Sequence, residues 1–251
     1  MFKGFYNLTS GMLTHGKRLD LVANNMANVT TVGFKTDRFT TSTFEEVMWQ
    51  RVGNRSKNYE ELGQESWITA PGQMYTDYTQ GSFDETNLPL DYAIDGNGFF
   101  AVETDNGRIY TRNGSFSLDD DGYLTLPGQG RVLSPGGELI QVVTDKLDVN
   151  DVGQLYREDG AYLGWIGVFQ FEDPDTQLRK NNEGMFVSED TPVQARDVRV
   201  RGGAVERSNV DWVREMQEMM SAQRAYQSAA EVLKIYDEAI NRAATEVGRL
   251  S

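Results

Sequence analysis

The sequence contains no cysteine and only one histidine, His15, among its 251 residues. Disulfide bonds and cysteine-ligated metal sites are therefore impossible, and one imidazole cannot form a paired-histidine metal site. A histidine-centred catalytic triad is also disfavoured, because His15 lies in a segment with the pattern of an N-terminal helix. We expect no catalytic site, no metal ion and no cofactor.

Basic residues are scarce, since 24 Lys and Arg stand against 38 Asp and Glu for a net charge of -14. Duplex nucleic acids are bound through Lys and Arg that neutralise phosphates, so this balance argues against a nucleic-acid partner. No apolar run approaches the ~20 residues of a transmembrane helix, so we expect no membrane insertion. The first residues, Met1 to Asn7, lack the features of a conventional cleaved signal peptide.

The charge is concentrated in the middle of the chain. Residues 1–38 carry five basic and two acidic side chains, and residues 206–251 carry six basic and eight acidic ones, which leaves a net charge of -15 for residues 39–205. This division predicts an acidic central region between two ends of different character.

Both ends have apolar residues in alternating steps of three and four, which is the spacing of a coiled-coil seam. His15 is the only polar member of the N-terminal seam. These seams predict an assembly interface, whose members are Phe5, Leu8, Met12, Leu19, Val22, Met26, Met219, Tyr226, Leu233, Tyr236 and Ile240.

The ends of these two helices are predicted from capping residues. The N-terminal helix should falter near Thr30 to Gly33, where Gly33 suits a C-cap. No Pro or Gly interrupts residues 209–247, which allows one helix of almost 40 residues. Ser208 is the expected N-cap of that helix, with Asp211 as a favourable charge in its first turn.

Between the helices, short runs of β-branched and aromatic residues alternate with turns. No amphipathic helix separates these runs, so we expect an antiparallel β domain. Asn106-Gly107 predicts a hairpin with a type I′ turn. The sequence therefore predicts an α+β protein, mainly antiparallel β, with long terminal helices that form a coiled coil. Its expected parts are an N-terminal helix and junction (1–35), an extended linker (36–80), a β domain (81–205) and a C-terminal helix (206–251).

Motifs that could carry chemistry are incomplete. Ser117 to Gly122 resembles the start of a calcium loop, but Gly128 stands where a bidentate Glu is needed, so we expect a solvated turn. Carboxylate pairs such as Asp119 with Asp121, or Glu60 with Glu61, arise by chance among 38 acids. The methionines Met216, Met219 and Met220 favour the helix seam and its flank over a separate adaptable binding surface.

His15 leaves two interpretations open, a pH switch between packed helices or a polar residue tolerated at a seam position, and we favour the second. Asn24, Asn25 and Asn28 are poor helix formers at a helix end, where their side chains can bond exposed backbone. They predict a specified junction between the helix and the following loop.

Three blocks of sequence resemble the flagellar rod and hook protein family: Met12 with Leu19 to Lys35; Gln80 to Phe100, continued by Tyr110 to Phe116; and Gly203 to Val210. The C-terminal block is followed by Glu215-Met216 and by Gln223 to Tyr226, which also resemble the family. Together the blocks cover both ends and the middle of the chain in the order of the family. The residues that carry the resemblance at the two ends are Asn24, Asn25, Asn28, Gly33, Phe34, Ser208, Asn209 and Val210.

The resemblance implies a non-enzymatic axial subunit of the bacterial flagellum. It implies terminal helices that pair in the inner tube of the shaft, an outward-facing β domain, and termini that stay disordered until assembly. The implied partners are copies of the chain, other rod and hook subunits and the flagellar type III export apparatus. The implied location is the basal body in the cell envelope, after export without a cleaved signal peptide. The length favours a rod protein, of the proximal or distal type.

Two other hypotheses follow from the residues alone. A secreted carbohydrate- or matrix-binding β domain, oligomerised by its helices, would use Trp49, Trp67 and Trp165 as a stacking platform. A hydrolase would depend on single carboxylates. The rod subunit is strongly favoured over both.

Overall fold

A computed structural model describes residues 2–52, 59–142, 144–145, 147–181, 183–195 and 197–249. The chain forms two compact units, each built from segments that are far apart in the sequence. The helical unit contains Met1–Ala27, Asp37–Tyr75 and Asp211–Ser251, and the β unit contains Asn28–Thr36 and Thr76–Val210.

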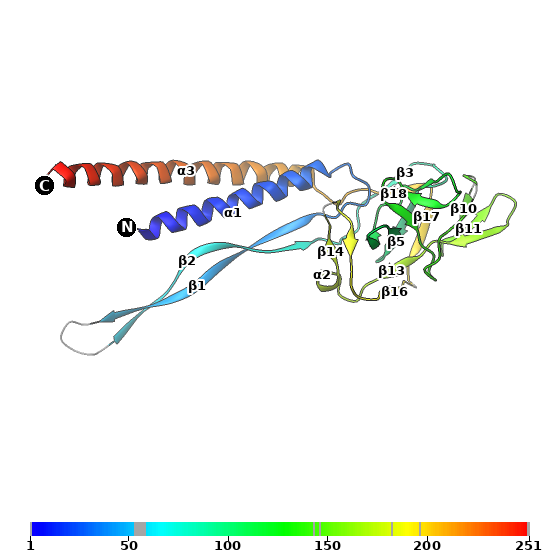
Figure 1. The fold of residues 1–251 in the computed structure, drawn as a ribbon, viewed down its shortest axis with the longest axis horizontal. Helices are drawn as coiled ribbons and strands as arrows, with labels where there is room; N and C mark the ends of the chain where they lie inside the picture. Colours follow the sequence, from blue (N-terminus) through cyan, green and yellow to red (C-terminus); the bar gives the residue numbers. More distant parts are fainter. Residues whose placement is uncertain are drawn as a thin grey trace. The chain divides into compact units, whose positions relative to one another are not determined.

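The helical unit is built on the two long terminal helices that the seams predict. Helix α1 (Phe2–Ala27) packs against helix α3 (Trp212–Arg249), as Figure 1 shows. The α+β class with long terminal helices is confirmed, whereas coiled-coil geometry stays a prediction. Helix α1 ends at Ala27, earlier than expected, because Asn28 begins a turn in which its carbonyl accepts a hydrogen bond from the amide of Thr31 at 3.2 Å.

The N-cap of α3 is Asp211, so the expectation of Ser208 is wrong. The Asp211 carboxylate accepts hydrogen bonds from the amides of Val213 at 3.0 Å and Arg214 at 3.2 Å. These amides would otherwise lack partners in the first turn. Ser208 lies earlier, where its hydroxyl accepts a hydrogen bond from the amide of Val210 at 3.3 Å.

The segment expected to be an extended linker contains two paired strands, β1 (Asp37–Val52) and β2 (Tyr59–Thr76). The hydroxyl of Thr40 donates across the pair to the carbonyl of Gln73 at 3.0 Å. The polar composition led to the linker interpretation, but backbone pairing requires no apolar side chains. The β-branched threonines near the start of β1 favour extended backbone, which is the physical reason for the difference.

The β unit is antiparallel, as predicted, and its largest sheet has nine strands. The main path of this sheet runs β14 (Arg179–Lys180), β15 (Phe186–Val187), β6 (Gly107–Thr111), β5 (Phe99–Thr104), β9 (Gly130–Val132), β8 (Leu124–Leu126) and β7 (Ser117–Leu118). Strand β13 (Val168–Gln170) pairs with both β5 and β16 (Val193–Gln194). The short helix α2 (Pro174–Gln177) follows β13.

Three smaller sheets complete the β unit. They are β10 (Leu147–Val149) with β11 (Gln154–Arg157) and β12 (Tyr162–Trp165), β17 (Arg199–Gly202) with β4 (Tyr92–Asp95), and β18 (Ala204–Glu206) with β3 (Phe83–Glu85). In the last sheet Glu206 lies opposite Phe83, so the end of the β unit pairs with a segment near its beginning.

The predicted hairpin at Asn106-Gly107 joins β5 to β6, but its turn is not type I′. Gly107 has a φ of +111°, whereas Asn106 does not take a positive φ. Thr104 lies opposite Gly107 in the register, and its hydroxyl accepts a hydrogen bond from the Asn106 amide and donates one to the Gly107 carbonyl. The Thr104 side chain thus forms the hydrogen bonds that stabilise the turn, so a second residue in the left-handed region is not needed.

The core of the β unit consists of two apolar clusters. The larger one contains buried residues of most strands, among them Tyr92, Ile94, Phe100, Leu124, Leu155 and Ile166. The smaller one is mainly aromatic, and its rings meet edge to face, with centroids 5.0 Å apart for Tyr110 and Phe171 and 5.3 Å apart for Phe99 and Phe186. Such ring pairs stabilise a core beyond the area that they bury.

One core residue predicts a stabilising substitution. Tyr92 is 1% exposed, and its hydroxyl has no hydrogen-bond partner among the described residues. Since an unpaired buried hydroxyl is costly, Tyr92→Phe should leave the free energy of unfolding unchanged or raise it by up to about 1 kcal/mol. Urea unfolding measures this. Tyr156→Phe is the control, because it removes a hydroxyl that donates to Gln154 at 2.9 Å and should be mildly destabilising.

Candidate assembly interface and chain junction

The seams meet in the contact between α1 and α3. A Cβ added to Gly4 would lie 3.9 Å from the Tyr236 ring, and one added to Gly16 would lie 4.0 Å from the Tyr226 ring. The helices therefore run antiparallel, with the start of α1 beside the C-terminal half of α3. Val22 and Ala222 are buried in this contact, and His15 lies on the seam with a buried Nδ1 that makes no hydrogen bond to the described atoms.

The predicted interface residues are covered to different degrees. Val22 is buried, and Phe5, Tyr226 and Ile240 remain exposed. The half-buried members are Leu8, Met12, Leu19, Met26, Met219, Leu233 and Tyr236. The pairing of α1 with α3 within one chain thus covers the seams only in part.

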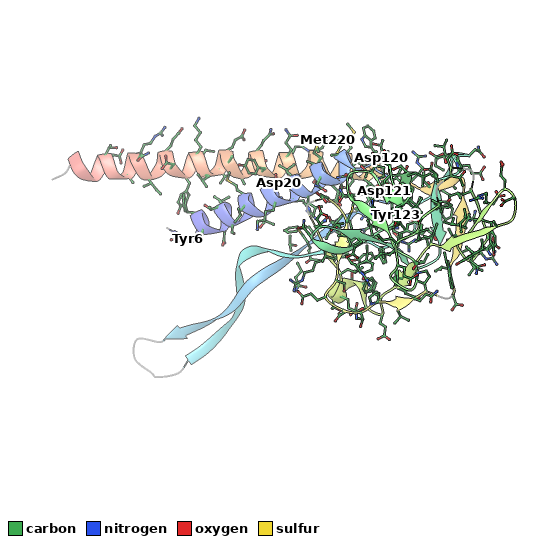
Figure 2. The ribbon with its side chains drawn as sticks, turned by 45° about the vertical axis from the view of Figure 1, so that its right-hand side comes forward. Tyr6, Asp20, Asp120, Asp121, Tyr123 and Met220 are labelled. Atoms are coloured by element: carbon green, nitrogen blue, oxygen red, sulfur yellow. The ribbon has the colours of Figure 1, made fainter. Side chains whose placement is uncertain are left out.

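Further apolar side chains lie outside the seams. Tyr6 and Leu13 on α1, and Val213, Met216 and Met220 on α3, are exposed. Figure 2 marks Tyr6 and Met220, which lie on the outer sides of the two helices. These side chains stay available for contact with another protein, which makes the two helix faces a candidate interface.

Asn25 is the buried polar residue that joins three segments of the helical unit. Its amide donates to the Asp37 carbonyl at 2.9 Å and to the Glu215 carboxylate at 3.3 Å, and its carbonyl oxygen accepts from the Asp37 amide at 3.2 Å. Burial raises the pKa of Glu215, and the hydrogen bond from Asn25 opposes that rise. Asn25 thereby fixes the start of β1 and the first turns of α3 against α1.

Apart from Asn24, which lies on α1, the remaining signature residues gather in the β unit. They lie in what we call the junction cluster: the segments 28–36 and 203–210 with the side chains that they contact. Gly33 has a φ of +69°, and its amide donates to the Glu206 carbonyl at 2.8 Å. A Cβ at Gly33 would lie 2.3 Å from the backbone of Arg112. Gly33 is therefore required for a close backbone approach in the β unit, and it is not the C-cap of α1.

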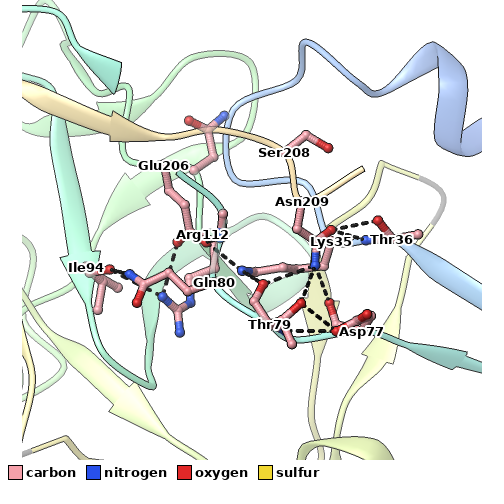
Figure 3. Close-up of polar contacts among 12 residues, drawn as sticks. Lys35, Thr36, Asp77, Thr79, Gln80, Ile94, Arg112, Glu206, Ser208 and Asn209 are labelled. Atoms are coloured by element: carbon pink, nitrogen blue, oxygen red, sulfur yellow. Dashed lines mark hydrogen bonds and ion pairs between the residues drawn. The ribbon is translucent and has the colours of Figure 1, made fainter. Parts of the chain in front are cut away.

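Three charged side chains form the centre of the junction cluster (Figure 3). Lys35, Arg112 and Glu206 are between 0 and 3% exposed. The Lys35 ammonium donates to Glu206 Oε1 at 2.6 Å, and the Arg112 guanidinium donates to Glu206 Oε2 at 3.1 Å. Buried charges persist in proteins when they are paired and hydrogen-bonded in this way.

The two cations also have uncharged partners. The Lys35 ammonium donates to the Thr79 carbonyl at 2.8 Å, and the Arg112 guanidinium donates to the Gly96 carbonyl at 2.8 Å. Burial lowers the pKa of Lys35, an effect that Glu206 opposes, and burial likewise lowers the pKa of Arg112. The carboxylate of Glu206 opposes the effect of burial on both cations.

Asn209 forms the second half of the junction cluster. Its carbonyl oxygen accepts from the Thr36 amide at 2.8 Å and the Thr36 hydroxyl at 2.7 Å. Its amide group donates to the carbonyls of Asp77 at 2.7 Å and Thr79 at 3.0 Å. Only an amide side chain accepts and donates in this pattern, because a carboxylate cannot donate and a hydroxyl is too short.

Phe34 contacts Lys180, a residue that the sequence analysis did not select. The Lys180 ammonium lies 3.8 Å from the centroid of the Phe34 ring and donates to the Lys35 carbonyl at 2.7 Å. Val210 and Ser208 are half-buried at the end of the second segment. Asn28 accepts from the hydroxyl of Thr31 at 3.1 Å, and Asn24 is exposed on α1.

Sequence reasoning missed the charged centre of this cluster. Lys35, Arg112 and Glu206 each lie within a block that resembles the family, but 171 residues separate Lys35 from Glu206. No periodicity or spacing relates side chains at such a separation. The sequence signal that could have identified these three residues is that each lies in a block that resembles the family.

The other candidate sites take structural roles. The Asp119 carboxylate accepts from the amides of Asp121 at 3.1 Å and Tyr123 at 2.7 Å, and Arg131 contacts the carboxylates of both Asp119 and Asp121 at 2.7 Å. The segment is a turn held by an arginine, as its glycine Gly122 at a φ of +80° indicates. Figure 2 labels this turn.

The remaining candidates are the tryptophans of the predicted stacking platform and the side chains that could bind a metal ion. Trp165 donates from its indole to the Val152 carbonyl at 2.8 Å, while the side chains of Trp49, Trp67, Glu60 and Glu61 lie outside the described part of the structure. Among the described residues, no group of three or more metal-ligating side chains occurs, and no helix is both long and apolar enough to cross a membrane.

Three family descriptions match successive parts of the chain. Residues 5–35 match "Flagella basal body rod protein", residues 93–190 match "Flagellar hook protein FlgE/F/G D1 domain", and residues 201–246 match "Flagellar basal body rod FlgEFG protein C-terminal". The two ends of the junction cluster thus fall in the first and the last of these matches.

Individual relatives match over almost the whole length. The chain is 31% identical to the flagellar basal-body rod protein FlgG of Bacillus subtilis over 95% of this chain and 96% of the relative. It is 32% identical to the flagellar basal-body rod protein FlgF of Mesorhizobium japonicum over 93% of each chain. The flagellar hook protein FlgE of Borreliella burgdorferi is 34% identical over 52% of this chain but only 30% of its own length.

The long terminal helices, the antiparallel β unit and these matches together define a structural protein of the bacterial flagellum. The chain belongs to the family of flagellar basal-body rod and hook proteins.

The Asp119 turn predicts a pH dependence. Burial raises the pKa of Asp119, but the amide of Tyr123 and the contacts with Arg131 outweigh it, so the pKa lies below its ordinary value. The stabilisation is therefore complete above the unfolded pKa of about 3.9 and is lost as the pH falls through the lower folded pKa. The free energy of unfolding should therefore be lower for Asp119→Asn than for the wild type, and this difference should shrink as the pH falls through that range. Asp120→Asn, an exposed neighbour with the same charge change, should show no such trend.

The Asn209 contacts predict a large loss of stability on truncation. Asn209→Ala removes the hydrogen bonds to the Thr36 amide and hydroxyl and to the carbonyls of Asp77 and Thr79, and should lower the free energy of unfolding by about 2 to 3 kcal/mol. Ser208→Ala removes a single acceptor and should cost less than about 1 kcal/mol. Equal costs for both variants in chemical denaturation would contradict the role of Asn209.

Proposed function

We propose that the protein is a structural subunit of the rod of the bacterial flagellar basal body and assembles through its terminal helices. The proposal rests on the observation that the apolar seams of both α1 and α3 are only partly buried. Phe5, Tyr226 and Ile240 stay exposed after α1 and α3 pack, and the outer sides of both helices carry more apolar side chains. Relatives of the chain are named as flagellar basal-body rod proteins, which supports a role of this surface in contacts between subunits.

The assembly follows from the geometry of such contacts. The apolar side chains that remain on α1, such as Leu13, and those on α3, such as Met220, belong to different surfaces. Contacts between different surfaces of identical subunits are heterologous, and they generate a helical filament when the rotation does not close. Burial of large apolar side chains, at about 1.5 to 3 kcal/mol each, drives the association.

We further propose that the terminal helices form the inner layer of the shaft as a coiled coil and become ordered on assembly. Helix α1 contains Gly4, Gly11 and Gly16, each of which lowers its intrinsic helix propensity. A helix of this composition depends on packing for its stability. The partners are copies of the chain, other rod and hook subunits and the type III export apparatus.

Within the family, we propose a rod subunit over a hook subunit, because the matched rod proteins are covered almost completely and the hook protein is not. Relatives named FlgG and FlgF both match over more than nine tenths of the chain, so the proximal and distal positions both remain. The role is non-enzymatic. The comparisons give no support to a carbohydrate- or matrix-binding protein, which glycan binding by the purified protein would revive.

The seam is tested by placing a charge on it. Leu233→Asp, or Ile240→Asp, should prevent incorporation into basal bodies and abolish motility, because a carboxylate cannot be buried between helices without a partner. Ser228→Asp places the same charge at an exposed position of α3 and should be tolerated. Basal bodies isolated from cells that express each variant provide the measurement, with circular dichroism to show that the β unit is folded. Normal incorporation of Leu233→Asp would contradict the interface.

A further inference from the structure

The junction cluster joins the first and the last segments of the β unit. Segment 28–36 and segment 203–210 are bonded directly by the Gly33 amide to the Glu206 carbonyl, by the Asn209 amide to the Phe34 carbonyl and by Lys35 to the Glu206 side chain. These two segments also lead into α1 and α3.

The charges at this point are unequal. Two cations, Lys35 and Arg112, share a single carboxylate, that of Glu206, which is 0% exposed. Asp77 also acts on Lys35 through its charge, but more weakly than Glu206 does. Removal of the Glu206 charge would leave two buried cations facing mainly carbonyl dipoles, which is strongly unfavourable.

Every oxygen of Glu206 is engaged. Oε1 accepts from Lys35 and from the Gly81 amide at 2.9 Å, Oε2 accepts from Arg112, and the backbone carbonyl accepts from Gly33. These partners belong to three segments that are distant in the sequence, because Gly33 and Lys35 both lie in segment 28–36. A single side chain therefore links the two ends of the β unit to its sheets.

We propose that the Lys35–Glu206–Arg112 cluster is a conformational lock, in which the Glu206 carboxylate holds segments 28–36 and 203–210 as one cooperative unit. The two segments open and close together, because neither cation has a full charge partner without Glu206. The lock does not depend on the proposed function, since it concerns the β unit of the chain alone.

The test compares Glu206→Gln with Glu103→Gln in the full-length chain by amide hydrogen exchange. Gln keeps the shape of Glu206 but removes its charge, so the amides of Gly33, Thr36 and Asn209 should all exchange about tenfold faster or more, by a similar factor. Glu103 is an exposed carboxylate paired with Arg108 at 3.3 Å, so its variant should leave these amides unchanged. Unchanged exchange in Glu206→Gln, or faster exchange in only one segment, would overturn the lock.

A second variant keeps the proposal testable if Glu206→Gln folds poorly. Lys35→Met removes one of the two cations, so the double variant Lys35→Met/Glu206→Gln should unfold at a higher temperature than Glu206→Gln alone. Simple loss of packing would instead lower the unfolding temperature of the double variant further. That result would overturn the charge-based account, whatever the outcome for assembly of the rod.

Discussion

The fold of the β unit depends on one fully buried carboxylate. Glu206 satisfies two buried cations, an amide of the Gly81 segment and, through its backbone, the amide of Gly33. A buried ion pair rarely adds much net stability compared with apolar packing, but its geometric demands make alternative arrangements costly. The junction cluster thus joins segments that are distant in the sequence through buried charges, and Asn209 adds neutral hydrogen bonds.

The helical unit follows a different physical logic. The buried amide of Asn25 ties α1 to β1 and α3, Arg18 of α1 pairs with Glu218 of α3 at 3.7 Å, and the apolar seams between the helices are only partly covered. Glycines in α1 weaken the isolated helix, and exposed Leu13 and Met220 stay in contact with water. The β unit is thus held by specific polar bonds, whereas the helical unit leaves apolar side chains exposed. These two properties suit a subunit that uses its helices to contact other subunits.

Sequence reasoning succeeded where the relevant residues are close in the chain. The seams predicted both helices, and turn residues predicted the hairpin and the Asp119 turn, because these signals repeat or act within a few residues. It failed for Ser208, since the competing cap Asp211 lies three residues away, and for β1 and β2, whose polar residues conceal the extended backbone. Lys35, Arg112 and Glu206 could not be related by any local pattern, because only the fold brings them together.

The position of Glu206 along the chain has a consequence for biosynthesis. A ribosome adds Lys35 and Arg112 long before it adds residue 206, so the nascent chain carries both cations while their shared carboxylate has yet to be made. Burial of Lys35 and Arg112 is unfavourable throughout that interval. The ion pairs of the β unit are therefore complete only after most of the polypeptide has been synthesised.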